Sequence, residues 1–128
     1  MSVKVKDVMN PDVVTIEATA PLMDALELMF EKSVKSLIIP PRDESDAFGI
    51  LTLTDIAKKA IARDERLEML NVYDLMSKPC IGVNEDLGVR LAAKLLTDFN
   101  ISRAVVTDGK SLRGIVSITD LVRSMLKK

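Results

Sequence analysis

Apolar residues recur at helical spacing in two stretches of the chain, residues 22–33 and 87–99. Side chains three and four positions apart share one face of a helix, so both stretches predict amphipathic helices. Each is followed by a short apolar run, at 37–39 and at 104–106, that is typical of a buried strand. The order of helix and then strand therefore occurs twice.

Shorter signals complete each half of the chain. β-Branched residues predict a strand near the start of each half, and another strand leads directly into a further helix. A polar loop at 40–46 and a tight Asp-Gly turn at 107–110 connect the strands. Each half therefore reads strand, helix, strand, strand, helix, an α+β pattern; the additional elements are strands at 13–16, 48–52, 80–83 and 112–117, and helices from Asp55 to about 62 and from Asp120 to about 126.

The two halves are copies of one unit. Eight residues from Gly49, GILTLTDI, return from Gly114 as GIVSITDL with four positions identical. An internal repeat of this kind decides the fold. We predict a first repeat at 1–62, a charged helical connection at 63–71 and a second repeat at 72–128. The opening residues of the first repeat are expected to feed a short strand. Because units of about 60 residues bury little apolar surface, we expect the two copies to share a core.

Composition narrows the possible functions. Hydrophobic residues make up 48% of the chain and the net charge is −1, which argues against binding to nucleic acid through phosphate neutralisation. No apolar run is long enough to span a membrane and no signal-peptide pattern opens the chain, so we expect a cytoplasmic protein. The first repeat is also two residues longer than the second in the stretch before its glycine block.

Catalytic chemistry has few candidates in this sequence. There is no histidine, Cys80 is the only cysteine, and no P-loop or cluster of metal ligands is present. Disulfides within the chain, Ser-His-Asp and Cys-His arrangements are thereby excluded. Cys80 is best read as a small buried apolar residue. We predict that the protein is not an enzyme and needs no metal and no cofactor.

The repeated Thr/Ser-x-Thr-Asp block is the candidate binding element. In the first copy, a strand is expected to end at Thr52 and a helix to begin near Asp55, so free backbone N–H groups would gather there and favour an anion. Thr52 and Thr54 would point to one face of the extended segment, and the carboxylate could accept hydrogen bonds from two ribose hydroxyls. Helix capping alone would explain the same residues. The two roles are compatible.

The order of elements, the openings Asp7-Val8-Met9 and Asp74-Leu75-Met76, and the closing Gly-x-x-Thr/Ser-x-Thr-Asp blocks resemble the cystathionine-β-synthase (CBS) domain family. The resemblance covers essentially the whole chain as one tandem pair. It implies β-α-β-β-α repeats packed sheet to sheet about a pseudo-twofold axis. It also implies two clefts that bind adenosine ligands such as AMP, ADP, ATP or S-adenosylmethionine, and dimerisation through helices.

The resemblance implies that each cleft draws on both repeats. Asp120 would bind the ribose, and Arg103 stands where a phosphate-binding arginine is found in the AMP-binding subunit of an AMP-activated kinase. The expected lining of this cleft is Ala20, Ala25, Val34, Lys35, Ser102, Arg103, Ile115, Ser117, Thr119 and Asp120. Pseudo-symmetry predicts a second cleft formed by Ile50, Thr52, Thr54, Asp55, Leu87, Ala92, Ile101 and Ser102.

The two clefts are expected to differ. Ser36 stands opposite Arg103 in the repeat, and Leu87 opposite Ala20, so we predict tighter binding of phosphorylated ligands at Asp120. The Asp55 cleft could prefer an uncharged or cationic tail, as in S-adenosylmethionine. The leading hypothesis is a regulatory module that senses an adenosine ligand, forms a homodimer to bury its remaining apolar helix faces, and signals to an effector protein. The alternative is a structural dimerisation module with vestigial clefts.

Overall fold

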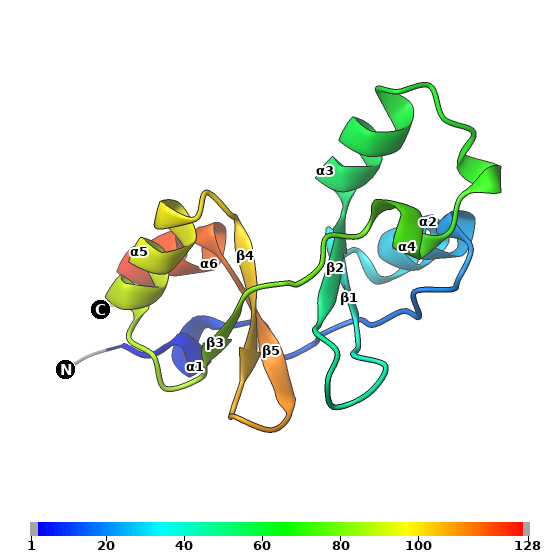
Figure 1. Cartoon of the computed structure of the whole chain (residues 1–128). Coiled ribbons are helices and arrows are strands. Elements are labelled where there is room, and N and C mark those ends of the chain that lie inside the picture. Colours follow the sequence, from blue (N-terminus) through cyan, green and yellow to red (C-terminus); the bar gives the residue numbers. More distant parts are fainter. Residues whose placement is uncertain (1–2, 127–128) are drawn as a thin grey trace. The chain divides into compact units, whose positions relative to one another are not determined.

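The computed structural model describes residues 3–126, which fold as two compact units (Figure 1). The central unit comprises residues 14–80. The terminal unit combines the residues up to Val13 with those from Ile81 onwards. Each unit has a hydrophobic core of its own. The chain therefore enters the central unit after Val13 and returns to the terminal unit after Cys80.

The central unit packs its helices against a two-stranded antiparallel sheet. Leu22, Ala25 and Met29 share one face of the first long helix and are almost completely buried, as its amphipathic pattern predicts. Ser36 pairs with Thr52 across the two strands. In chain order the elements are α2 (Leu22–Lys32), β1 (Ser36–Ile39), β2 (Gly49–Thr52), α3 (Leu53–Ile56), a π-helical continuation (Ala57–Ile61), a 3-10 turn (Leu67–Met69) and α4 (Val72–Leu75).

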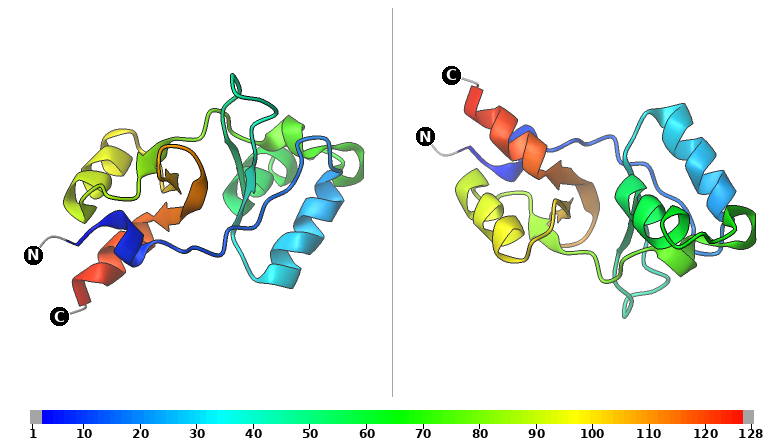
Figure 2. Two further views of the ribbon diagram at one scale, coloured as in Figure 1. Left: turned by 90° about the horizontal axis from the view of Figure 1, so that it is seen from below. Right: turned by 90° about the horizontal axis from the view of Figure 1, so that it is seen from above.

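The terminal unit is built around a three-stranded sheet. Its strand order is β3-β4-β5, with β3 parallel and β5 antiparallel to β4. Figure 2 shows α1 lying alongside α6, and the two helices are in contact. The elements are α1 (Val5–Val8), β3 (Gly82–Asn84), α5 (Val89–Asp98), β4 (Arg103–Thr107), β5 (Leu112–Ser117), α6 (Ile118–Arg123) and a 3-10 turn (Ser124–Leu126).

The leading segment of each repeat, residues 3–13 and 72–80, packs in the unit that the other repeat builds. Asn10 exchanges two backbone hydrogen bonds with Ile115, at 2.8 and 3.0 Å. Ser77 does the same with Ile50, at 2.8 and 2.9 Å. The close approach depends on glycine, because a Cβ at Gly114 would lie 2.8 Å from the Asn10 carbonyl oxygen. The two units are thus made from interleaved parts of the two repeats.

Most predicted elements are confirmed. The helices expected at 22–33 and 87–99 appear as α2 and α5, and the buried strands at 37–39 and 104–106 lie within β1 and β4. β5 begins and ends where the sequence predicts. These elements have the clearest apolar periodicity or the longest apolar runs, and they supply much of both cores.

The predicted strand at 13–16 is wrong as a continuous element. Only Thr15 forms a bridge, parallel to Ile38, with hydrogen bonds on either side of it. Its counterpart in the second repeat is a strand, but it begins at Gly82 and not at residue 80. The three-stranded sheet of the terminal unit therefore corresponds to two strands and a single bridge in the central unit.

Two predictions for the segments before each repeat are also wrong. The opening residues do not form a strand: Lys4 makes one bridge, and α1 begins at Val5 because the Asp7 carboxylate accepts a hydrogen bond from the Lys4 amide at 2.9 Å. Met1 and Ser2 lie outside the described residues. The connection at 63–71 is not a helix but holds one 3-10 turn, since Asp64 takes a left-handed conformation that interrupts helical geometry.

Candidate functional site

Each Thr/Ser-x-Thr-Asp block forms a tight junction between a strand and a helix. The helices begin at Leu53 and Ile118, two residues earlier than predicted, so Thr52 and Ser117 are the N-cap residues. The predicted extended segment through Thr54 is therefore wrong, because Thr54 already lies in the first helical turn. The early start follows from a capping box that the threonine or serine forms with the aspartate three residues on.

The capping box occupies one carboxylate oxygen of each aspartate. In the terminal unit, Asp120 Oδ2 accepts hydrogen bonds from the Ser117 amide at 2.9 Å and from the Ser117 hydroxyl at 3.0 Å. In the central unit, Asp55 Oδ2 accepts one from the Thr52 amide at 3.1 Å. The cap hydroxyls accept in return from the Asp120 and Asp55 amides. The capping interpretation is thus confirmed for both blocks.

The second oxygen of each aspartate faces a cation on the same helix. Lys59 Nζ lies 3.6 Å from Asp55 Oδ1, and an Arg123 guanidinium nitrogen lies 3.5 Å from Asp120 Oδ1. Both aspartate side chains are largely but not fully buried, at 17% and 19% exposure. Each carboxylate therefore keeps acceptor capacity on Oδ1, which is what recognition of a ribose diol would need.

The neighbouring strand brings the predicted phosphate residues to the terminal-unit block. Arg103 pairs with Ser117 across β4 and β5, and the Ile118 amide donates to the Ser102 carbonyl at 2.9 Å. Ser102, Arg103, Ser117 and Asp120 are therefore neighbours within one unit. Arg103 as a whole is half-buried, and its guanidinium donates to the exposed Ser102 hydroxyl at 3.3 Å.

The central unit repeats this arrangement without the arginine. Ser36 pairs with Thr52, and the Leu53 amide donates to the Lys35 carbonyl at 3.1 Å. Lys35 is exposed. The backbone geometry is thus shared by the two blocks, whereas the cation at the start of the strand is present only in the terminal unit.

The remaining predicted site residues divide into buried and accessible groups. Ala25 and Ala92 have no exposed surface and belong to the cores, so we leave them out of the proposed site. Thr54 and Thr119 are exposed. Ile50 is buried and Ile115 half-buried. The others pack at the edge of the core of their own unit: Ala20 and Val34 in the central unit, Leu87 and Ile101 in the terminal unit.

Sequence reasoning missed the two helical cations. Lys59 follows Asp55 by four residues and Arg123 follows Asp120 by three, spacings that place side chains on one helix face. That spacing was available as a signal in the sequence.

The terminal unit also has a small pocket beside Asp120, lined by Asp7, Val8, Met9, Asp120, Arg123 and Ser124.

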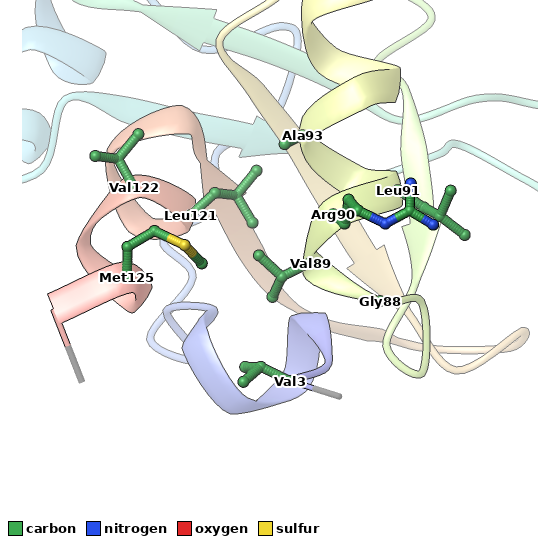
Figure 3. Close-up of a pocket in the computed structure, with 9 residues that line it drawn as sticks. All are labelled: Val3, Gly88, Val89, Arg90, Leu91, Ala93, Leu121, Val122 and Met125. Carbon is green, nitrogen blue, oxygen red and sulfur yellow. The ribbon is translucent and has the colours of Figure 1, made fainter. Parts of the chain in front are cut away.

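A larger, mostly apolar groove lies between α5 and α6 (Figure 3). Its exposed apolar lining includes Val122 and Met125, whose exposed fractions are 63% and 66%. Leu91 and Val3 also line the groove, and Arg90 is its charged member. This surface is chemically unlike the Asp120 block, because it offers apolar contact and few polar partners.

The described residues contain neither a metal-binding cluster nor a membrane-spanning helix. Within residues 3–126 no group of histidine, cysteine, aspartate or glutamate side chains is placed to hold a metal ion. No helix in this part of the chain combines the length and the apolar character needed to cross a bilayer.

Comparison with known proteins identifies the family to which the chain belongs. The sequence model of the CBS domain matches it twice, over residues 5–62 and 72–127. An uncharacterized protein of Methanopyrus kandleri is 32% identical over 123 residues, an alignment that covers 95% of this chain and 62% of the relative. The chain thus spans less than two thirds of that relative's length.

Two solved structures give the same result. The hexameric CBS-CP12 protein from bloom-forming cyanobacteria is 42% identical, with a TM-score of 0.89 over 94% of this chain and 69% of that one. The CBS domain pair of protein MJ0100, solved in complex with 5′-methylthioadenosine and S-adenosyl-L-methionine, is 28% identical, with a TM-score of 0.81 over 98% and 97% of the two chains. The chain belongs to the CBS domain family, as a tandem pair of repeats.

Proposed function

We propose that this CBS pair is a regulatory module that binds an adenosine ligand and signals its presence to a partner protein. The observation that carries the proposal is the repeated aspartate at a strand-to-helix junction, with Oδ2 used by the cap and Oδ1 facing a cation. A carboxylate held in this way is rigid and can still accept from ribose hydroxyls. The complex of the MJ0100 pair with two adenosine ligands supports this ligand class.

The two sites are proposed to be unequal. Arg103, beside Ser117, adds a bidentate phosphate donor near Asp120, and Ser36 occupies the same position near Asp55. We therefore expect AMP, ADP or ATP to bind more tightly at Asp120. Ala20, Val34 and Lys35 remain the proposed contribution of the first repeat to that cleft, and Leu87, Ile101 and Ser102 that of the second repeat to the Asp55 cleft.

The structure adds a cation beside Asp55 that the sequence argument did not consider. Lys59 lies 3.6 Å from Asp55, and its ammonium also donates to the Leu75 carbonyl and the Ser77 hydroxyl. Because this ammonium is already paired, it does not replace the missing arginine as a phosphate donor. We therefore expect Asp55 to accept phosphorylated ligands with lower affinity than Asp120, and an uncharged or cationic tail, as in S-adenosylmethionine, remains the proposed preference of the Asp55 cleft.

We also propose a homodimer. The α5–α6 groove leaves Leu91, Val122 and Met125 exposed, and burying such a surface against a second copy is favourable. One observation favours the alternative of a structural dimerisation module: both capping boxes give their aspartates a structural role that needs no ligand.

A ligand screen separates these functions. Thermal shift and calorimetry with AMP, ADP, ATP, S-adenosylmethionine and 5′-methylthioadenosine should find at least one ligand that binds and raises the melting temperature. A stable dimer that gives no heat and no shift with any of them would support the structural alternative. Conversion of ATP to another nucleotide would contradict a purely regulatory role.

A further inference from the structure

Lys59 connects the aspartate of the central unit to the leading segment of the second repeat. Its ammonium donates to the Leu75 carbonyl at 3.0 Å and to the Ser77 hydroxyl at 3.4 Å, and lies 3.6 Å from Asp55 Oδ1. The side chain is 31% exposed, so these contacts are partly shielded from water. An ammonium has three donors, and three oxygen groups surround this one.

Among the described residues of the terminal unit, none makes this connection. The repeat places Ser124 opposite Lys59, and the short Ser124 hydroxyl donates within its own helix, to the Leu121 carbonyl. Val8 and Met9 correspond to Leu75 and Met76 of the other leading segment.

Where the Lys59 side chain lies in the central unit, the terminal unit has the small pocket beside Asp120. Arg123 reaches Asp120 there from an exposed position, with 62% of its side chain accessible. The same fold position therefore holds a bridging lysine in one unit and a small pocket in the other.

We infer that Lys59 is a positioning residue that couples ligand binding at Asp55 to the leading segment 72–80. The inference rests on the proposed use of Asp55 for a ribose. Ribose hydroxyls that donate to Oδ1 compete with Lys59 for the carboxylate charge. The ammonium then directs its donors to Leu75 and Ser77, and the leading segment is held more firmly. This segment continues into the terminal unit at Ile81, as segment 3–13 continues into the central unit at Val14. Because only Asp55 is bridged to its leading segment by a lysine among the described residues, binding at Asp55 carries a signal that binding at Asp120 does not.

Amide hydrogen exchange offers matched reporters. Ser77 and Ile50 exchange two backbone hydrogen bonds in the central unit, and Asn10 and Ile115 do so in the terminal unit. Without ligand, Lys59→Met should speed exchange at Ser77 and Ile50 about fivefold and leave Asn10 and Ile115 unchanged. Lys58→Met, at an exposed neighbour on the same helix, is the control and should change neither pair.

The ligand arm uses 5′-methylthioadenosine, which carries a ribose diol and no phosphate. It should slow exchange at Ser77 and Ile50 in the wild type and in Lys58→Met, but not in Lys59→Met, while calorimetry still shows binding to all three. Equal slowing with and without Lys59, or no effect of Lys59→Met on the unliganded protein, would overturn the inference. Absence of binding to the wild type would overturn the proposed ligand class and, with it, the coupling at Asp55, whereas the unliganded comparison would still show whether Lys59 holds the leading segment. Lys59→Gln repeats both arms if the methionine variant does not fold.

Discussion

Asp46 and Lys78 form a short ion pair, with 2.6 Å between Asp46 Oδ1 and Lys78 Nζ. Asp46 belongs to the loop that is longer in the first repeat, and Lys78 to the leading segment of the second. The Asp46 carboxylate also accepts from the Arg42 amide at 2.9 Å. Pro11 occupies the position of Lys78 in the other leading segment and carries no ammonium. The terminal unit therefore cannot form an equivalent ion pair at this position.

The Asp46–Lys78 pair predicts an acid-sensitive contribution to stability. The Lys78 ammonium beside Asp46 holds the pKa of that carboxyl well below its usual range. A group whose pKa is lowered by folding stabilises the protein above its unfolded pKa, about 4, and loses that contribution as the pH falls toward the lowered value. Asp46→Asn should therefore be less stable than the wild type at pH 7, and the difference should shrink below about pH 4.

Urea unfolding at several pH values measures this difference. Glu44→Gln, an exposed change in the same loop, is the control and should have little effect. A stability difference for Asp46→Asn that stays constant down to about pH 2 would contradict the assignment of the pair.

The glycines of the two repeated blocks should respond differently to alanine. A Cβ at Gly114 would lie 2.8 Å from both the Asn10 carbonyl oxygen and the Met9 sulfur, so backbone must move. At Gly49 the nearest atom is the Met76 sulfur at 3.3 Å, the flexible part of a side chain. We expect Gly114→Ala to cost about 1–3 kcal/mol and Gly49→Ala less than about 1 kcal/mol. Chemical denaturation of both variants checks the order, and equal costs would argue against the tight packing of residues 9–10 on β5.

The α5–α6 groove should determine oligomeric state. Val122→Asp places a charge on its exposed apolar surface and should shift the protein toward monomer, because an unpaired charge is costly to bury. Sedimentation velocity at micromolar concentration measures the shift. Asp98→Asn, an exposed change near the end of α5, should leave the dimer intact. A monomeric wild type, or a Val122→Asp protein that dimerises as well as the wild type, would exclude this groove as the interface.

The sequence was most informative where apolar periodicity is strong. α2, α5 and β5 follow from it because burial of one face is a local property of the pattern, and β4 follows from the continuous apolar run 104–106. The leading segments could not be predicted in the same way. Val5 donates to the Leu87 carbonyl and Ser77 pairs with Ile50, contacts between residues far apart in the chain.

In the candidate site, too, the sequence revealed the local pattern but not the contacts between distant residues. The repeat revealed Asp55 and Asp120, and strand order brings Arg103 beside Ser117 as the family pattern implies. The helix starts were misplaced because the aspartate was taken as the first helical residue, whereas it is the third helical residue of a capping box. The i, i+4 spacing could have revealed the pairing of Lys59 with Asp55, but its contacts with Leu75 and Ser77 join residues far apart in the sequence and could not be predicted.

Calorimetric titration of AMP into the wild type and into Asp120→Asn tests the central claim most directly. Asparagine keeps the shape of the cap but removes the charge that would receive the ribose hydroxyls. A hydrogen bond to a charged group contributes about 1.5–3 kcal/mol. We therefore predict that AMP affinity at the tighter site falls about tenfold or more in Asp120→Asn and stays unchanged in Asp55→Asn and in Asp98→Asn. AMP binding that is unchanged in a folded Asp120→Asn protein would contradict the account.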